Sequence, residues 1–380
     1  MNRRSWERVV AAVGAGARPM SAHLATMIDG IRIQTNAVGS QLITSSALGG
    51  LAGADDSFEV PASGSLTGLR EARRVNVDRA VGLPDRARVW AESVAPSPVV
   101  EITAVRGGYT GTKWMLLLSQ GERLVLRWSD PRRWGDVGRE HVRREVVACQ
   151  LLAEAALPVP QLVASDVDGT ATDGPANLVT WLPGRSRLER LDAAAITDLA
   201  RRAVSVHRQV VPVHRHPPTF SFCGPAEAQI PDWSSKPWLW RRAIEMLAGG
   251  PPTTPRGLLH GDFHLGNLLW QHDTVTGLID WAETSWGPAD LDVAHMCADL
   301  AMLHSTADAL AFRAAYRKQG GQLDPDPAAA RFWAVSDIVG FLPDPAHILV
   351  AVASNRPDLT PDAVRKGLES LLEAVLERRP

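Results

Sequence analysis

The spacing of hydrophobic and polar residues changes along the chain and divides it into three regions. Residues 1–84 are rich in Ala, Gly, Ser and Arg and show no sustained period, which is typical of loop or of a small accessory extension. In residues 85–180 short apolar runs alternate with turn residues, as in antiparallel strands. In residues 181–380 apolar positions recur mainly at helical spacing. We therefore predict an α+β protein in which a β-rich unit precedes a mainly helical one.

The β-rich unit is predicted to be a small antiparallel lobe, a β-meander with one long helix. A glycine-rich stretch, R-G-G-Y-T-G at 106–111, forms the first turn of the meander. Apolar residues at helical spacing predict a helix over 139–156, which Pro158 and Pro160 end. The remaining elements expected here are a short helix at 86–94 and strands at 98–105, 113–119, 123–128, 161–165 and 177–182.

The helical unit carries one irregular stretch and several predicted helices. Residues 192–210 are periodic, whereas 220–240 are irregular and rich in aromatic residues, which either pack in the core or line a substrate pocket. A helix is expected from about Asp290, whose side chain is placed to cap it. Three or four helices should fill the rest of the chain, with breaks at Pro343, Pro345 and Pro357.

The candidate chemistry is concentrated in two neighbouring segments. H-G-D-x-H-x-G-N spans residues 260–267, and I-D-W spans residues 279–281. Two short strands joined by a tight turn would place Asp262, Asn267 and Asp280 close together. Carboxylate and carboxamide oxygens suit Mg²⁺ and its phosphate ligands. The segment therefore predicts a magnesium-phosphate site.

The two histidines of this segment allow a second interpretation. H-x-x-x-H indicates zinc when it lies on a helix, but Gly261 and Gly266 favour a loop. We therefore expect His260 and His264 to order the loop by hydrogen bonding.

The five-residue step from Asp262 to Asn267 is also the step between the base and the metal-binding Asn of the protein-kinase catalytic loop. Together with I-D-W, the segment resembles the catalytic core of the aminoglycoside phosphotransferase family. This resemblance implies a two-lobed protein-kinase-like fold with ATP, or alternatively GTP, and Mg²⁺ in the cleft between the lobes. It implies that Asp262 accepts the proton of the attacking hydroxyl and that Asn267 and Asp280 hold the metal.

The resemblance further implies a nucleotide site built mainly from the β-rich unit. Arg127 stands where the family has a lysine on the third strand, a departure because Arg presents a wide planar fork rather than a point charge. Arg127 is otherwise interpretable as a surface charge at the end of a strand. Asp292 matches a residue that orders the catalytic loop. The implied nucleotide contacts are Gly107, Gly108 and Thr110 over the phosphates, Arg127 paired with Glu145, and the backbone of Thr180, Trp181 and Leu182 at the adenine edge.

The amino-acid composition argues against some classes of binding partner. The 380 residues have a formal net charge of −2, with 45% hydrophobic and 22% charged residues, so no basic surface indicates nucleic acid or a membrane as a partner. The three cysteines are far apart and are interpreted as thiols in a reducing compartment. The basic N-terminus contains Glu7 and only a weak apolar run, which argues against a secretion signal. We expect a cytoplasmic protein.

These observations predict an ATP-dependent phosphotransferase that acts on a hydroxyl of a small molecule, as aminoglycoside-resistance enzymes do. The acceptor stays open, because choline, homoserine, a macrolide or a sugar-like metabolite would suit the same residues. A non-catalytic nucleotide-binding regulator is the alternative from another class. Arg127 favours it, and the intact set of Asp262, Asn267 and Asp280 argues against it. A protein kinase is disfavoured, because Asp280 leads almost directly into a helix without an activation segment.

Overall fold

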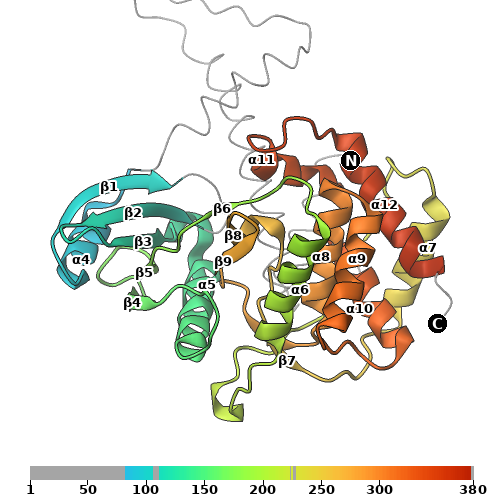
Figure 1. Cartoon of the computed structure of the whole chain (residues 1–380), viewed down its shortest axis with the longest axis horizontal. Coiled ribbons are helices and arrows are strands. Elements are labelled where there is room, and N and C mark those ends of the chain that lie inside the picture. Colours follow the sequence, from blue (N-terminus) through green and yellow to red (C-terminus); the bar gives the residue numbers. More distant parts are fainter. Residues whose placement is uncertain (1–81, 106–110, 223, 226–227, 378–380) are drawn as a thin grey trace, which may run out of the picture.

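The computed structural model describes residues 82–105, 111–222, 224–225 and 228–377, which form a small sheet-based lobe and a larger helical lobe (Figure 1). All but the last three residues of the extension predicted at 1–84 lie outside this description. The α+β architecture predicted from the sequence is confirmed.

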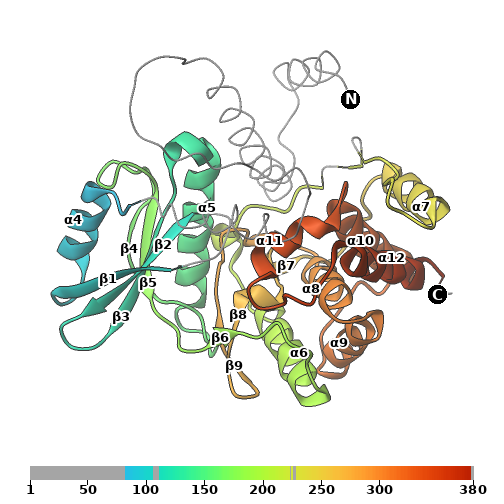
Figure 2. The same cartoon turned by 90° about the horizontal axis from the view of Figure 1, so that it is seen from above.

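The small lobe is a five-stranded antiparallel sheet with the strand order β1-β2-β3-β5-β4. Helices α4 and α5 lie on its two faces (Figure 2). The predicted meander is therefore correct, with ends displaced by one or two residues. The elements are α4 (Asp85–Val94), β1 (Val99–Val105), β2 (Thr112–Leu118), β3 (Arg123–Trp128), α5 (Pro131–Leu152), β4 (Leu162–Asp166) and β5 (Ala176–Thr180).

Side chains along the strands alternate between two faces of the sheet. In β3, Leu124, Leu126 and Trp128 are buried in one cluster with Ala87 and Ala91 of α4. Neighbouring positions on a strand point to opposite faces, so the residues between these point toward α5. The period of two therefore places the charged residues of the central strands on the side of α5.

Helix α5 begins eight residues earlier than the pattern predicted, at Pro131 rather than Arg139. Asp130 caps it by accepting a hydrogen bond from the N–H of Arg132 at 2.9 Å, and Pro131 suits the first helical position. A kink at Gly135, where φ is 49°, interrupts the helix. The sequence pattern detected only the part beyond this kink, because the first turn does not share its apolar period.

The helical lobe contains one helix that the sequence did not predict. Residues 237–240 were assigned to an irregular aromatic stretch but begin α7 (Pro237–Ala248), with Pro237 in its first turn. The other helices agree with expectation in number and order. They are α6 (Ala193–His207), α8 (Asp290–Leu303), α9 (Thr306–Lys318), α10 (Pro327–Gly340), the short α11 (Leu349–Val352) and α12 (Pro361–Glu377).

Two small sheets carry the loops of the helical lobe. Strand β7 (Gly257–Leu259) pairs with β10 (Ser285–Gly287). Strands β8 (Leu268–Gln271) and β9 (Thr274–Leu278) form a hairpin, and β6 (Arg185–Ser186) pairs with β8. His272 lies in the hairpin turn with a φ of 53°. The predicted pair of strands around this turn is confirmed.

Each lobe has its own hydrophobic core, and α5 contributes to the larger one. Ala148 and Leu152, in the last turns of α5, pack in the cluster that also contains α6, α8, α9, α10 and α12. In the described part of the chain, no single helix is long and apolar enough to cross a bilayer. A pair of segments, Pro327–Gly340 and Pro345–Val352, meets those criteria together but is bent by 70° between them.

Candidate functional site at the junction of the lobes

The β8–β9 hairpin brings Asp262, Asn267 and Asp280 into one neighbourhood, as the sequence predicted. Asn267 immediately precedes β8, and its carbonyl oxygen accepts a hydrogen bond at 3.0 Å from the N–H of Ile279, next to Asp280. The Nδ2 of Asn267 donates to the main-chain oxygen of Asp262 at 3.0 Å and to its Oδ2 at 2.9 Å. The loop and the hairpin therefore form one hydrogen-bonded unit, as the sequence predicted.

Gly261 has a backbone conformation that only glycine fits at this position. Its φ is 85°, and a Cβ there would lie 2.0 Å from the main-chain oxygen of Glu283. The loop thereby passes directly against the segment that follows Asp280. Close approach of these two backbones places the carboxylates of Asp262 and Asp280 on the same side of the lobe boundary.

One face of α8 holds the loop at three points. Asp292 accepts hydrogen bonds from the N–H groups of His260 and Gly261 at 2.8 and 2.9 Å, and Asp299 accepts one from Leu265 at 2.9 Å. His295, one turn after Asp292, places Nε2 3.3 Å from Oδ1 of Asp262. Residues three and four apart share a helix face, so the three acidic and basic side chains point at successive parts of the loop. The role given to Asp292, ordering the loop, agrees with these contacts.

The expectation for Asp290 was wrong. This residue starts α8, but its carboxylate accepts a hydrogen bond from the N–H of Asp324 at 2.9 Å and makes no capping bond to its own helix. It ties the loop before α10 to α8 instead.

The loop histidines have hydrogen-bonding roles. His260 is buried, its Nε2 donates to the carbonyl of Ile279 at 3.0 Å, and its Nδ1 accepts the N–H of Asp262 at 3.3 Å. Burial lowers the pKa of His260, consistent with a neutral ring that both donates and accepts. His264 accepts from the N–H of Gly266 at 3.1 Å, and its Nε2 lies 3.6 Å from Oδ2 of Asp262. Both rings order the loop as predicted.

His295 is the main residue at Asp262 that sequence reasoning missed. Its Nδ1 lies 3.0 Å from Oδ1 of Asp337 in α10, so each ring nitrogen faces a carboxylate. The ring also stacks on Phe341, with centroids 5.6 Å apart. Burial alone would lower the pKa of His295, but the charge of Asp337 and the contacts to Asp262 outweigh it and hold the pKa well above its ordinary value. The sequence feature that could have identified His295 was its position one helical turn after Asp292.

Removal of this imidazolium is expected to destabilise the protein in a pH-dependent way. His295→Asn should lower the free energy of unfolding by about 1.5–3 kcal/mol, the usual contribution of a hydrogen bond to a charged group. Because the folded-state pKa is raised, the contribution is complete below about pH 6.5 and is lost as pH rises through the folded pKa. Urea unfolding of wild type and variant at pH 6 and pH 10 measures it. An equal difference at both pH values would show that the ring stabilises only by packing.

Asp280 receives two cations from the small lobe. Its Oδ1 accepts from Nη2 of Arg127 at 2.7 Å, and its Oδ2 lies 3.1 Å from Nζ of Lys113. Burial would raise the pKa of Asp280, but the charges of Arg127 and then Lys113 outweigh it, and the pKa is held well below its ordinary value. The carboxylate is therefore ionised at neutral pH, the state in which it can bind a metal.

Lys113 was not recognised from the sequence, although the meander contained the signal. Lys113 and Arg127 are directly opposite each other in the β2–β3 pair, so they point to the same face of the sheet. From the sequence, Lys113 is placed only at the start of a predicted strand. The register of the hairpin, rather than a motif, identifies it.

Arg127 and Glu145 form the buried ion pair that the sequence predicted. The other oxygen of Glu145 accepts from Nδ2 of Asn177 at 3.0 Å, and Asn177 also donates to the carbonyl of Val142 at 3.2 Å. A chain of contacts thus joins α5, β5 and β3 to Asp280 in the other lobe. Because both ends are buried, the guanidinium of Arg127 is fixed in position.

A second group of contacts crosses between the lobes beside this chain. His141 of α5 places Nε2 3.0 Å from Oε1 of Glu283, and Nη1 of Arg144 lies 3.6 Å from Oε2. Glu283 is three residues beyond Asp280, in the segment against which Gly261 packs. Helix α5 therefore contacts the segment 280–283 through two separate groups of charges.

The chain passes from one lobe to the other directly after β5, at the residues that the resemblance assigns to the adenine edge. The N–H of Thr180 is bonded to the carbonyl of Gln161 at 2.9 Å, and that of Trp181 to the carbonyl of Arg123 at 3.0 Å. Leu182 and Pro183 lie between β5 and β6. Gly184, with a φ of 123°, then turns the chain against the hairpin at Trp270.

Some of the predicted contacts cannot be placed. Gly107, Gly108 and Thr110 lie outside the described residues, as does Cys223. Cys149 and Cys297 are buried free thiols, as expected. Among the residues that the structure describes, no group of three or more His, Cys, Asp or Glu side chains is arranged to hold a metal ion. A magnesium site with one carboxylate, one carboxamide and phosphate oxygens needs no such group.

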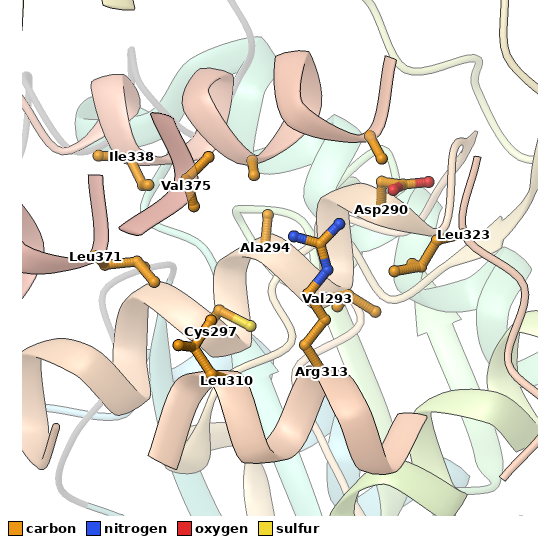
Figure 3. A pocket seen from close by; sticks show the side chains of 12 residues that line it. Asp290, Val293, Ala294, Cys297, Leu310, Arg313, Leu323, Ile338, Leu371 and Val375 are labelled. Atoms are coloured by element: carbon orange, nitrogen blue, oxygen red, sulfur yellow. The ribbon is translucent and has the colours of Figure 1, made fainter. Parts of the chain in front are cut away.

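Two cavities lie in the helical lobe. One, of about 20 Å³, is lined by α8, α9, α10 and α12, and the side chain of Arg313 extends into it past Val293 toward Asp290 (Figure 3). It has room for little more than one water molecule. The other, of about 200 Å³, is lined by Phe220, Phe222 and Trp333 together with the proline-rich stretch before β7. Of the aromatic stretch predicted to pack or line a pocket, Phe220 and Phe222 line this cavity and Trp240 is buried in the core, whereas Trp238 is exposed.

Comparison with known proteins decides the family. Residues 101–333, well over half of the chain, match the sequence profile of the phosphotransferase enzyme family, APH. The chain belongs to this family. The match contains Asp262, Asn267, Asp280, Arg127 and Glu145, so the residues assigned by resemblance all lie inside the APH region.

A curated relative shares part of the APH region. Homoserine kinase from Gluconobacter oxydans is 31% identical over 150 residues, which are 35% of this chain and 46% of that protein. The chain thus spans about half the length of the curated relative that it matches.

Solved structures share the APH fold at low sequence identity. A candidate aminoglycoside phosphotransferase from Ralstonia eutropha superposes with a TM-score of 0.52 and 17% identity, covering 78% of this chain and 99% of the other. Amicoumacin kinase, solved in complex with AMP-PNP and Ca²⁺, gives a TM-score of 0.50 with 12% identity, covering 81% and 96%. The protein-kinase-like fold predicted from the sequence is confirmed.

Proposed function

We propose that the protein is a small-molecule kinase, which transfers the γ-phosphoryl group of ATP to a hydroxyl group. The observation that supports this most directly is the junction of the lobes, where Asp262, hydrogen-bonded to Asn267, lies in the same unit as an ionised Asp280 held by two cations. Phosphoryl transfer needs positioning and charge neutralisation more than covalent catalysis. These residues offer both.

The roles follow from the contacts of each side chain. Asp262, held by Asn267 and His295, would aim the substrate hydroxyl and accept its proton. Asn267 donates through Nδ2, so its Oδ1 and the carboxylate of Asp280 would hold Mg²⁺, which supplies charge neutralisation to the phosphate oxygens. Arg127 would keep a fixed positive charge beside those oxygens. Leu182 would contact the adenine edge together with Thr180 and Trp181, and Gly107, Gly108 and Thr110 would cover the phosphates.

The acceptor is tested by a panel rather than by one compound. Purified full chain with ATP and Mg²⁺ should consume ATP when one member of a panel of homoserine, choline, aminoglycosides, macrolides and sugars is present. Homoserine belongs in the panel because the curated relative is a homoserine kinase. The nucleotide, ATP or GTP, is varied in the same assay.

The outcomes separate the hypotheses. Consumption that depends on one acceptor would establish the reaction and its substrate. Binding of AMP-PNP by calorimetry without turnover on any member would favour a nucleotide-binding regulator. Absence of both turnover and nucleotide binding would contradict the kinase proposal.

A further inference from the structure

The two cations on Asp280 are held very differently. The guanidinium of Arg127 contacts both Glu145 and Asp280 and its side chain is 9% exposed. Glu145 is in turn fixed by Asn177. The ammonium of Lys113 has Asp280 as its one charged partner among the described residues, at the end of a flexible four-carbon stem. One cation is therefore anchored and the other is able to move.

Both carboxylate oxygens of Asp280 are occupied by cations, Oδ1 by Arg127 and Oδ2 by Lys113. A divalent cation that binds this carboxylate would compete with one of them for its oxygen, since like charges a few ångströms apart repel in a buried site. We therefore expect one of the two cations to leave Asp280. Removing Arg127 would leave Glu145 buried without its partner, whereas moving Lys113 breaks a single contact.

The register of the sheet gives Lys113 a suitable destination. Lys113 lies opposite Arg127 on the face of the sheet that points toward α5 and Asp280. Its ammonium is a compact charge with three donors, and this is the group that binds phosphate as a point charge. Arg127 on β3 already binds two carboxylates, so it does not supply a point charge of this kind to the phosphates.

We infer that Lys113 is the residue that contacts the nucleotide phosphates, moving from Asp280 when the metal-nucleotide complex binds, while Arg127 stays as the fixed link between Glu145 and Asp280. This inference rests on the proposed function. It places the phosphate-binding ammonium on β2 in place of the β3 lysine expected by resemblance, so that Arg127 in β3 does not weaken the nucleotide site.

The test compares two probes on the full chain. Lys113→Met should weaken binding of AMP-PNP with Mg²⁺, measured by calorimetry, by about 10- to 100-fold, the factor for one lost charged hydrogen bond. Binding of adenosine, which has no phosphates, should not change. Lys113→Arg retains the charge and should lose less affinity than Lys113→Met. Lys318→Met, an exposed lysine at the end of α9, is the matched control and should bind as wild type.

Each contrary result has a distinct meaning. Equal AMP-PNP affinity in wild type and Lys113→Met would overturn the assignment of Lys113 and leave the kinase proposal intact. An equal loss for AMP-PNP and adenosine, with a lower unfolding temperature, would also overturn it, because Lys113 would then only hold the lobes together. Wild-type protein that does not bind AMP-PNP at all would overturn the nucleotide site and this inference with it.

Discussion

Replacing Asp262 by alanine is expected to lower kcat for phosphoryl transfer by about 10²- to 10⁴-fold, the range that general bases contribute. Under the proposed mechanism, the variant loses the group that aims the acceptor hydroxyl and takes its proton. Nucleotide affinity should remain close to that of wild type, because Asn267 keeps its bond to the main-chain oxygen of residue 262 at 3.0 Å and stays in position. Steady-state kinetics on the acceptor found in the panel measures kcat, and calorimetry with AMP-PNP measures binding.

Asp273→Ala is the matched control for this experiment. Asp273 lies in the turn of the β8–β9 hairpin, and its side chain is 71% exposed in a pair with Arg187. Asp273→Ala removes an acidic side chain from the same hairpin without touching Asp262 and should keep wild-type kinetics, because exposed ion pairs contribute little. Turnover of Asp262→Ala at the wild-type rate would sink the assignment of Asp262 as the base.

The helices and strands that could be predicted are those whose beginning and end are marked by residues in their own sequence. β2 and β3 are short apolar runs bounded by turn residues, and their pairing agrees with the prediction. The first turns of α5 and the whole of α7 could not be predicted in this way. Before the kink at Gly135 the apolar period is absent, and α7 begins within an aromatic stretch whose period is obscured by Pro237.

In the candidate site, too, residues close together in the sequence could be predicted to meet, whereas residues brought in from distant helices could not. Asp262, Asn267 and Asp280 are brought together by a short hairpin, so their spacing in the sequence was sufficient. His295 and Asp337 reach Asp262 from α8 and α10, and only the packing of those helices places them there. A family pattern also directed attention to β3, where Arg127 departs from it, and away from Lys113 on the neighbouring strand.

Asp292 is the residue whose removal should cost the fold most. It is buried and accepts hydrogen bonds from the N–H groups of His260 and Gly261, and Nε2 of His207 lies 3.0 Å from its Oδ2. Asp292→Ala leaves two buried backbone donors and one imidazole without this acceptor. We expect a loss of about 3–5 kcal/mol in the free energy of unfolding, the cost of breaking a buried charged pair.

The pH dependence of this loss distinguishes the charge from the packing. Burial would raise the pKa of Asp292, but the hydrogen bond and charge of His207, followed by the charge of His260 and the N–H of Gly261, outweigh it and lower the pKa. A depressed pKa gives stability that is complete above the unfolded value of about 3.9 and is lost as pH falls through the folded one. Urea unfolding should therefore show a constant difference between wild type and Asp292→Ala from pH 5 to pH 8 that narrows below about pH 4.

A second variant, Asp326→Ala, gives the reference for the size of this loss in the free energy of unfolding. Asp326 is exposed and caps α10 by accepting from the N–H of Ala328 at 2.9 Å, so Asp326→Ala should cost only about 1 kcal/mol. If Asp292→Ala costs no more than this control, the loop that carries Asp262 does not depend on α8 for its position. The loss of several kcal/mol expected instead would mean that the loop with Asp262 and Asn267 and the helix behind it fold as one unit. Preorganised charges of that kind are what phosphoryl transfer requires.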